Sequence, residues 1–409
     1  MTKEKLIYDL FLAYYEARKN KRNTVNQIAF EYNLEQNIFL LADELFTGKY
    51  ELGRSVYFIQ NHPVKREVFA SGFRDRIVHH LIYDYIYPIF DRSFIYDSYS
   101  CRVGKGTSFG IKRINSFIRA CSDNYTQDCY ILKLDIQGYF MSLDKNILFK
   151  QIEQKLFKHK ENMEYDFTIA LIKKVIFHDY TFNALFKGQR EDYIGLPKSK
   201  SLFYSDVECG LPIGNLTSQL FSNIYLDDFD KYIKTELKCE YYGRYVDDFI
   251  IIHKDKEYLT QIIIKIREYL DNNLNLILHP KKIYLQNYKK GVLFLGAFIK
   301  PYRNYIRKRT IGYFFGKIKI LNHRFKNQNY KMDYGLANDF SSIINSYLGM
   351  MKNYSSYKIR KKVLLSGIDA NFWNHFYISS NFKKIKSKNG HIGKLAGLQN
   401  QLGLTYYNV

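Results

Sequence analysis

Three aspartates lie in strongly apolar stretches of the sequence, where their spacing could support metal-dependent chemistry. Asp135 follows the apolar run YILKL within DCYILKLDIQGYF, residues 128–140. Asp247 and Asp248 are adjacent in GRYVDDFIIIH, with apolar residues on both sides. Burial of an isolated carboxylate is costly, or its pKa rises until it binds a proton. A chain that places three such groups in apolar strands therefore needs a cation to stabilise them.

Hard divalent cations fit this requirement because they prefer oxygen ligands. Two such ions about 3.5–4 Å apart activate an attacking oxygen and stabilise a leaving oxygen in phosphoryl transfer. We predict that Asp135, Asp247 and Asp248 form a catalytic site for two Mg²⁺ ions, for which Mn²⁺ can substitute. The alternative for an Asp-Asp pair alone is a solvated turn or a helix cap. The matching acid in a second apolar strand favours the metal site.

The composition predicts a folded protein with a polyanionic partner. The chain has 409 residues, of which 46% are hydrophobic. Lys and Arg number 62 against 40 Asp and Glu, which gives a formal net charge of +22. This excess favours nucleic acid over an anionic membrane surface as the partner. Codon usage in an AT-rich genome is an alternative source of the lysines, but it does not predict where they fall.

Other classes of protein are disfavoured by the apolar segments and the cysteines. No apolar run approaches the roughly 20 residues that cross a bilayer, and the N-terminal MTKEKLIYDLF lacks the core of a signal peptide. Five cysteines form no CxxC pair, which indicates neither a disulfide framework nor a zinc site. The sequence therefore predicts a soluble, intracellular protein without a membrane partner.

Hydrophobic periodicity predicts an α+β protein. Strands are expected at 56–72 as a hairpin, at 128–140, on both sides of Asp247 and Asp248, and at 292–299 as one buried strand. Helices are expected in 1–50 with a basic break at 18–23, in 74–90, in most of 145–185, in 216–238 and after 305. The polar stretch 186–210 is expected to be irregular.

Seven ordered blocks in the middle of the chain resemble the motifs of reverse transcriptases. YVDDF resembles their YxDD box, and LDIQGYF resembles their first catalytic-aspartate motif. The other five are KREVFASGFRDRIVHHLI, DSYSCRVGKGTSFGI, GLPIGNLTSQLFSNIYLDDFD, LILHPKKIYL and VLFLGAFI. The resemblance covers roughly residues 56–305. It implies an RNA-directed DNA polymerase with a right-hand fold of fingers, palm and thumb, in which the palm contains an antiparallel sheet.

The resemblance also implies a division of the chain. A helical N-terminal extension is expected at 1–55, fingers at 56–127 and a palm at 128–302, with an insertion around 145–210. A helical, basic thumb is expected at 303–385 and a C-terminal tail at 386–409.

The family's functional residues can be carried onto matching positions here. Asp135 and Asp247 would bridge the metals, with Asp248 in support and the carbonyl of Ile136 completing one metal shell. Phe140 would lie under the sugar of the incoming dNTP and exclude a 2′-hydroxyl. The remaining nucleotide-binding residues implied are Lys65, Arg66, Arg74, Gly214, Gln219 and Lys282, the last as a proton donor to pyrophosphate. The alternatives are a core aromatic for Phe140 and solvated surface groups for the basic residues.

The block before the YxDD box departs from the Q-G-x-x-x-S-P pattern of most bacterial reverse transcriptases. It has Ile213 in place of Gln and Gln219 in place of Pro. This variant resembles the reverse transcriptases of diversity-generating retroelements, which copy a template-repeat RNA into cDNA with errors at adenines and so diversify a target gene. Isoleucine packs but cannot hydrogen-bond, so discrimination between nucleotides should fall. We therefore assign a fidelity role to Ile213; the alternative is neutral drift.

This subfamily implies particular partners: template RNA, an RNA–DNA hybrid, dNTPs and an oligomer of a small basic accessory protein. It also implies a cytoplasmic protein encoded by a bacterium or phage. Basic residues of the thumb are expected to hold the template–primer through its phosphates, namely Arg307, Lys308, Arg309 and Lys317; a solvated helix face is the alternative.

Two competing functions stay open. One is another bacterial reverse transcriptase, either antiviral or intron-derived. The region after the thumb lacks a CxxC or HNH-like element, which disfavours an intron-encoded protein with an endonuclease. The other is a non-catalytic RNA-binding protein on the same fold, which would have no reason to keep Asp135, Asp247 and Asp248.

Overall fold

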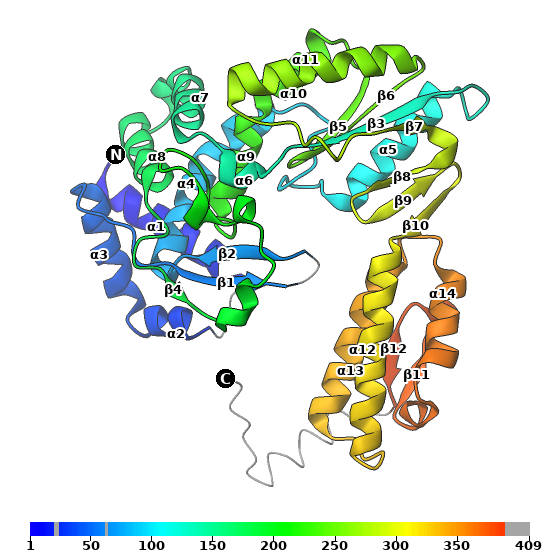
Figure 1. Ribbon diagram of the computed structural model, residues 1–409. Coiled ribbons are helices and arrows are strands. Elements are labelled where there is room, and N and C mark those ends of the chain that lie inside the picture. Colours follow the sequence, from blue (N-terminus) through cyan, green and yellow to red (C-terminus); the bar gives the residue numbers. More distant parts are fainter. Residues whose placement is uncertain (20–23, 62–63, 389–409) are drawn as a thin grey trace. The chain divides into compact units, whose positions relative to one another are not determined.

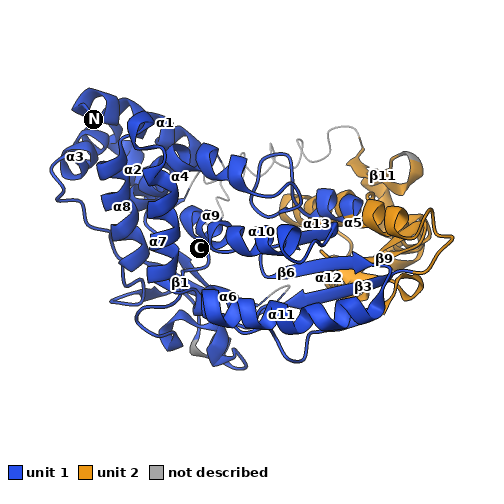
Figure 2. Ribbon diagram, turned by 90° about the horizontal axis from the view of Figure 1, so that it is seen from above, with its two compact units in different colours: residues 1–113, 129–285 blue, residues 114–128, 286–409 orange. Residues whose placement is uncertain are grey.

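A computed structural model describes residues 1–19, 24–61 and 64–388 of the chain. Contacts divide the chain into two compact units: residues 1–113 with 129–285, and residues 114–128 with 286–409 (Figure 2). Part of the predicted basic break at 18–23 and most of the predicted tail at 386–409 lie outside the described residues. The finer division into extension, fingers, palm and thumb stays a prediction.

The acid-bearing strands lie in a four-stranded sheet with the order β5-β6-β3-β7 (Figure 1), which belongs to the first unit except for the end of β7 from Gln286. Its strands are β3 (Tyr130–Asp135), β5 (Tyr241–Tyr245), β6 (Asp248–His253) and β7 (Tyr284–Asn287). β6 pairs antiparallel with both β3 and β5, and α11 (Lys256–Leu274) packs against β3 and β6. The central strands bury runs of Ile and Leu, as expected for strands covered on both faces.

Helices pack around this sheet in the same unit. The N-terminal helices are α1 (Lys3–Arg18), α2 (Val25–Tyr32) and α3 (Leu34–Phe46), and α1 and α3 pack on each other and α1 on α4 (Phe73–Ser93). The apolar stripe predicted for α4 is buried at Ile77, Leu81, Ile82 and Ile86. The remaining helices are α6 (Tyr139–Ser142), α7 (Lys145–Phe157), α8 (Tyr165–Phe177), α9 (Leu216–Tyr225) and α10 (Asp227–Thr235). The single helix predicted at 216–238 is therefore two helices, because Leu226 leaves helical geometry and three aspartates favour a new N-terminus from Asp227.

The predicted hairpin at 56–72 is confirmed as β1 (Val56–Gln60) and β2 (Arg66–Ala70), with β4 (Leu185–Phe186) added to β1. The stretch 186–210 consists mainly of short 3₁₀ turns. Glu67 of β2 is fully buried, and it accepts hydrogen bonds from Ser201 Oγ at 2.9 Å and the Leu202 amide at 2.7 Å. These bonds fix the irregular segment to the hairpin.

The second unit contains a three-stranded sheet and a helical part. The sheet has the order β10-β9-β8, formed by β8 (Val292–Phe294), β9 (Ala297–Lys300) and β10 (Arg303–Ile306). The one buried strand predicted at 292–299 is wrong, because Leu295 and Gly296 have φ angles of 50° and 80° and form a turn between two antiparallel strands. α5 (Thr107–Cys121) crosses the division between the units.

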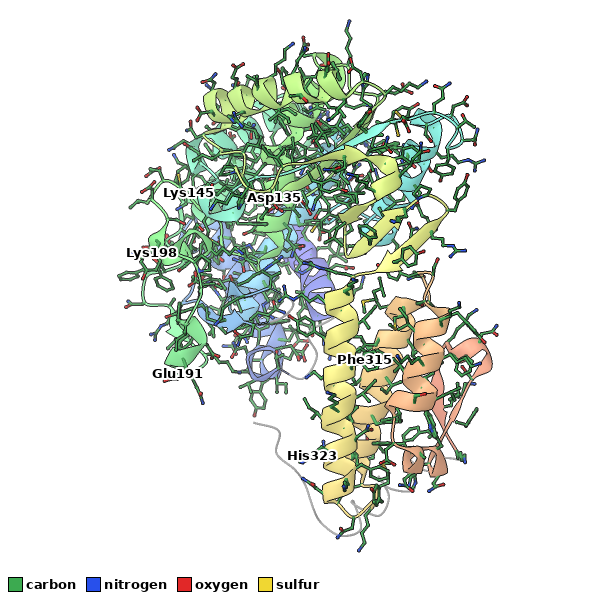
Figure 3. All side chains as sticks on the ribbon, turned by 45° about the vertical axis from the view of Figure 1, so that its right-hand side comes forward. Asp135, Lys145, Glu191, Lys198, Phe315 and His323 are labelled. Carbon is green, nitrogen blue, oxygen red and sulfur yellow. The ribbon has the colours of Figure 1, made fainter. Side chains whose placement is uncertain are left out.

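The helical part of the second unit has its own core. It comprises α12 (Lys308–Asn327), α13 (Tyr334–Met351), α14 (Tyr357–Lys362) and the two-stranded pair β11 (Phe376–Ile378) and β12 (Ile385–Ser387). Phe340 stacks on Phe372 with ring centroids 4.0 Å apart in this core. Phe315 and His323 are labelled along α12 in Figure 3.

The α+β class predicted from the sequence is confirmed by this arrangement of sheets and helices. Within the described residues, no helix has the length and apolar character needed to cross a bilayer.

Candidate active site

The pairing of β3 with β6 brings the three predicted aspartates together. Asp135 ends β3 (Figure 3) and lies directly opposite Asp248, the first residue of β6. The Ile136 amide donates to the carbonyl oxygen of Asp247 at 3.3 Å. The three acids therefore lie at one end of the sheet, although Asp135 is more than a hundred residues from the other two in the sequence.

Asp247 is held in a tight and strained turn. Tyr245 pairs with Asp248, so Val246 and Asp247 form the two-residue connection between β5 and β6. Val246 has a φ of 56°, a conformation that β-branched residues rarely adopt. Such strain costs on the order of 1–3 kcal/mol and persists only where surrounding contacts impose it.

A buried arginine supplies one of those contacts. The guanidinium of Arg244 is fully buried and donates to the Val246 carbonyl at 3.1 Å. The same group forms a two-armed ion pair with Asp230 of α10, at 2.7 Å and 2.6 Å. Tyr242 also donates to Asp230, at 2.5 Å. Burial works against the charged form, but Asp230 outweighs it and raises the pKa of Arg244.

Our sequence reasoning missed this brace between α10 and the turn. Two signals are present in the sequence. Arg244 lies within the apolar strand YYGRY, and Asp230 is the last residue of LDDFD. A buried charge requires a partner of opposite sign, so a buried Arg244 requires a buried acid beside it. The sequence alone does not show which of the neighbouring aspartates supplies it.

Lysines act as counter-ions at the two acids that face each other. Lys282 Nζ donates to Asp135 Oδ1 at 2.7 Å, so this predicted residue lies at the site. Lys133 Nζ lies 3.0 Å from Asp248 Oδ1, which is an ion-pair distance without hydrogen-bond geometry. The buried Oδ1 of Asp248 accepts no hydrogen bond in the described part of the chain. Burial raises the pKa of Asp248, although Lys133 opposes the shift.

Within residues 1–19, 24–61 and 64–388, Asp247 has no such counter-ion in direct contact. Burial, followed by the negative charges of Asp135 and Asp248, raises its pKa to about 6. The site therefore carries an uncompensated carboxylate beside two paired ones, which is the charge balance of a cation site.

The loop before α9 is fixed to the hairpin β1–β2 by close backbone contact. The Phe69 amide donates to the Ile213 carbonyl at 2.8 Å. Gly214 has a φ of 131°, and a Cβ there would lie 2.1 Å from the Phe69 carbonyl oxygen. A residue with a Cβ would fit this position only if β2 or the loop before α9 moved.

Ile213 and Phe140 pack against the same apolar cluster. The cluster consists of Phe69, Met141, Tyr180 and Leu202, and both side chains are half-buried beside it. The structure therefore brings the predicted fidelity residue and the predicted sugar-contacting residue into one neighbourhood. Gln219 is exposed on α9 and accepts from Cys101 Sγ at 3.2 Å.

A neutral histidine supports this loop from behind. His79 is buried, with Nδ1 2.9 Å from Thr217 Oγ1 and Nε2 3.3 Å from Ser71 Oγ. Ser71 also donates to Asn215 Oδ1 at 2.9 Å. Burial lowers the pKa of His79 to about 3, so the imidazole stays neutral at physiological pH.

The predicted triphosphate-binding residues differ in their surroundings. Arg66 is exposed at the start of β2; burial raises the pKa of Tyr245 in the YVDDF segment, and the positive charge of Arg66 weakly opposes that rise. Lys65 Nζ donates to the Ile194 carbonyl at 2.7 Å. Arg74 forms ion pairs with Glu44 and Asp75 and lies over the Tyr50 ring. A triphosphate would have to displace those carboxylates from Arg74, so Arg66 is the better placed of the three.

Comparison with known proteins decides the family. Residues 68–299 match the family described as reverse transcriptase (RNA-dependent DNA polymerase), which is more than half of the 409 residues. This chain belongs to the reverse transcriptase family. Membership confirms the predicted right-hand polymerase fold and the RNA-directed DNA polymerase activity.

Individual relatives of this reverse transcriptase are distant. Protein YkfC of Escherichia coli is 23% identical over 331 residues, which cover 73% of this chain and 77% of that protein. The putative COX1/OXI3 intron 2 protein of Saccharomyces cerevisiae is 22% identical over 315 residues, which cover 60% of this chain and 33% of that protein. Among solved structures, apo telomerase from Candida tropicalis, truncated from the C-terminal domain, has a TM-score of 0.45 and 14% identity, covering 64% of this chain and 58% of that one.

Reverse transcriptases use divalent metal ions, and the residues at this site fit such an ion in part. The charge balance at Asp135, Asp247 and Asp248 suits a cation, and the buried Asp248 Oδ1 has no hydrogen bond. As the side chains stand, no three His, Cys, Asp or Glu residues within 1–19, 24–61 and 64–388 are grouped to hold a metal. Lys282 and Lys133 hold two of the acids instead.

The predicted template–primer residues of the reverse transcriptase lie in the second unit. Arg307, Lys308, Arg309 and Lys317 are all exposed at the N-terminal half of α12. Arg309 Nε donates to the Tyr313 hydroxyl at 2.6 Å, with its guanidinium over that ring. Their contact with nucleic acid stays a prediction.

The raised pKa of Asp247 predicts a pH-dependent effect of Asp247→Asn on stability. In the unfolded chain the carboxyl ionises at about 3.9, and in the folded protein at about 6, so ionisation destabilises the folded state as pH rises between these values. In EDTA, the variant should exceed the wild type in free energy of unfolding by about 1–3 kcal/mol at pH 7.5, and by less at pH 5. Urea unfolding at both pH values checks this. Asp271→Asn, at an exposed acid, should show no such trend, and a variant less stable than wild type at pH 7.5 would contradict the account.

The brace at Arg244 predicts a change in metal dependence for Arg244→Lys. Lysine keeps the charge but cannot hold both Asp230 oxygens and the Val246 carbonyl together, so Asp247 should lose its fixed position. We expect kcat to fall about 10–100-fold, with a higher Mg²⁺ concentration for half-maximal activity. Arg102→Lys is the control, because the side chain of Arg102 is 6% exposed and bonds to Asp91 and the Ile95 carbonyl. An unchanged Mg²⁺ dependence in a folded Arg244→Lys protein would remove the positioning role.

Proposed function

We propose that this chain is the reverse transcriptase of a diversity-generating retroelement, which copies a template RNA into cDNA with errors at template adenines. The observation that carries the proposal is the block from Ile213 to Gln219, which has Ile and Gln where most bacterial relatives of this family have Gln and Pro. The cDNA would then replace sequence in a target gene. The coarser activity, RNA-directed DNA synthesis, follows from family membership.

In this proposal, each cycle forms a bond between the primer 3′-oxygen and the α-phosphorus of a dNTP and breaks the bond to pyrophosphate, while the proton of the 3′-hydroxyl leaves to solvent. Mg²⁺, held by Asp135, Asp247, Asp248 and the Ile136 carbonyl, would supply charge stabilisation for both oxygens. Lys282 donates a hydrogen bond to Asp135 in the structure. In the reaction it would leave Asp135 and protonate the departing pyrophosphate. Arg66 would bind the triphosphate by charge-assisted hydrogen bonds, with Lys65 and Arg74 as further candidates.

The proposed error-prone copying depends on Ile213. Its side chain packs against the apolar cluster that Phe140 also contacts, and it offers no hydrogen bond to a nascent pair. Phe140 would still exclude a ribose hydroxyl by shape. Sugar selection would therefore be kept, whereas base selection would lose a polar contact that rewards the correct geometry.

The proposed partners follow from the same resemblance and from charge. Template RNA, its hybrid with the new DNA and dNTPs would be the ligands, and a small basic accessory protein would bind as an oligomer. Arg307, Lys308, Arg309 and Lys317 are exposed, and they would contact phosphates of the hybrid. Such contacts weaken steeply as salt rises.

An intron-derived reverse transcriptase is the second candidate. The name of the yeast relative refers to an intron, and that relative is 22% identical to this chain. This candidate predicts accurate cDNA and stimulation of splicing of an intron RNA from the chain's own locus. The first candidate predicts neither.

The proposal predicts Mg²⁺-dependent cDNA synthesis with a distinctive error spectrum. Purified protein, with RNA from its own locus and any small basic protein encoded beside it, should make cDNA whose substitutions are concentrated at template adenines. Asp135→Asn and Asp247→Asn should each lower the rate by at least about a thousandfold, since each removes a proposed metal ligand. Incorporation of labelled dNTP measures the rate, and sequencing of the products measures the error spectrum. Accurate cDNA from the active wild-type protein would leave the reverse transcriptase and reject the retroelement type.

Ile213→Gln tests the fidelity role directly. A glutamine amide restores a hydrogen bond beside the nascent pair, so errors at adenines should fall several-fold, within the roughly tenfold that the net contribution of one hydrogen bond allows. Ile213→Val is the matched control, because it keeps an apolar, β-branched side chain and should keep the error spectrum. Deep sequencing of cDNA from all three proteins gives the comparison. Equal spectra for Ile213→Gln and wild type would refute this account of Ile213.

A further inference from the structure

A stack of three tyrosines in the second unit has no part in the chemistry described above. Tyr288 is buried, and its ring stacks on Tyr125 with centroids 6.1 Å apart. Tyr125 in turn contacts Tyr302, with centroids 4.4 Å apart. Tyr302 is 79% exposed, so the stack ends in a ring that is open to solvent.

Tyr302 occupies a backbone position that normally suits another residue type. Lys300 pairs with Arg303, so Pro301 and Tyr302 form a two-residue turn between β9 and β10. Tyr302 has a φ of 62°. A proline followed by a residue with positive φ is the pattern of a type II turn, whose second position favours glycine or asparagine. A tyrosine there carries a backbone cost that its ring does not recover by burial.

Tyr125 shows the same feature. It is the last of three successive left-handed residues, with φ angles of 48° at Asp123, 56° at Asn124 and 72° at Tyr125. Aspartate and asparagine adopt this conformation readily, whereas tyrosine adopts it only at a cost in free energy. Backbone strain of this kind concentrates where a side chain must be presented in a fixed direction.

Hydrogen bonds hold the lower part of the stack rigid. The Tyr288 hydroxyl donates to the Tyr125 carbonyl at 3.1 Å, and the Tyr125 amide donates to Ser122 Oγ at 3.0 Å. Arg119 Nε donates to Asn124 Oδ1 at 2.7 Å. The exposed ring of Tyr302 therefore rests on a support that is formed before any ligand arrives, which lowers the entropic cost of binding.

The charges on the segments that carry the stack favour an anionic ligand. Lys289, Lys290, Lys300 and Arg303 flank Tyr288 and Tyr302 in the sequence, whereas the loop around Tyr125 contributes Asp123 and Asp128. Lys289 is paired with Asp128 at 2.7 Å. The basic groups exceed the acidic ones, so a polyanion with flat, stackable groups fits this surface.

We propose that Tyr302, supported by Tyr125 and Tyr288, stacks on an unpaired base of the bound RNA, with the neighbouring lysines and Arg303 near its phosphates. Every base has an aromatic face, so such a platform accepts single-stranded RNA of any sequence. Bases within a duplex are already stacked and are not available to it. The inference rests on RNA as the ligand of the proposed function, but it does not depend on the error spectrum.

The test compares binding of two RNA–DNA hybrids by the full-length protein. One hybrid is blunt, and the other carries single-stranded RNA tails at both ends. Tyr302→Ala should weaken binding of the tailed hybrid about tenfold, within the range for loss of one stacked base, and leave the blunt hybrid unchanged. Tyr302→Phe should bind both as wild type does, because the ring is kept. The tenfold difference should persist as salt rises, since stacking releases no counterions.

Tyr305→Ala is the control within the same sheet, because Tyr305 lies in β10 outside the stack and should bind both hybrids as wild type does. Equal binding of the tailed hybrid by Tyr302→Ala and wild type would overturn the proposal. Equal weakening of both hybrids by Tyr302→Ala would also overturn it, since that result indicates a general loss of structure. Accurate cDNA would reject the retroelement type and leave this binding result untouched, so the two failures can be told apart.

Discussion

Mutual repulsion among three carboxylates has to be overcome where β3 meets β6. The register that pairs Asp135 with Asp248 fixes this repulsion in place, because a slip of β6 by one residue would turn Asp248 to the opposite face of the sheet from Asp135. The apolar residues that follow in β6 are buried on both sides, and their packing forbids the slip. Hydrophobic burial along the strands therefore supplies the free energy that keeps the acids adjacent.

The surrounding charges show how the protein tolerates this arrangement. Arg244 and Asp230 neutralise each other in the core behind the turn, and Arg244 uses a remaining donor on the Val246 carbonyl. Removing one member of such a pair would leave a buried charge without a partner. Lys282 and Lys133 neutralise the outer acids but are themselves partly exposed, so they can move when another cation or a phosphate competes. The buried pair of Arg244 and Asp230 thus holds the backbone, whereas Lys282 and Lys133 would yield to a bound ligand.

Much of this site could be predicted from the sequence, because its signals are local. An acid inside an apolar strand is visible in a short window, and so is the pair in YVDDF. The hairpin at β1–β2 and the buried stripe of α4 also follow from periodicity within one segment. The partnership of Arg244 with Asp230 was not predicted, because Asp227, Asp228 and Asp230 are equivalent candidates until α10 has packed.

One wrong prediction, at 292–299, and one set of contacts that the sequence does not reveal, at Arg74, have related physical causes. The stretch 292–299 is apolar throughout, and periodicity does not reveal a turn in which Leu295 adopts positive φ beside Gly296. The surroundings of Arg74 depend on Glu44 of a helix that is distant in sequence. In both places the deciding contact is between segments whose pairing only the folded chain defines, so a resemblance to family motifs identifies the residue but not its partner.

The link between β2 and the loop before α9 would couple base selection to triphosphate binding under the proposed function. Phe69 contacts Ile213 and Gly214 through its backbone, and β2 begins with Arg66, which is proposed to bind the triphosphate. A displacement of the hairpin by a bound triphosphate would therefore be passed to Ile213 through backbone atoms, which deform less than side chains. Because Ile213 also packs beside Phe140, the same displacement would change the fit of both base and sugar. Under the proposed roles, side chains at 213 would act on nucleotide choice through the hairpin as well as through direct contact.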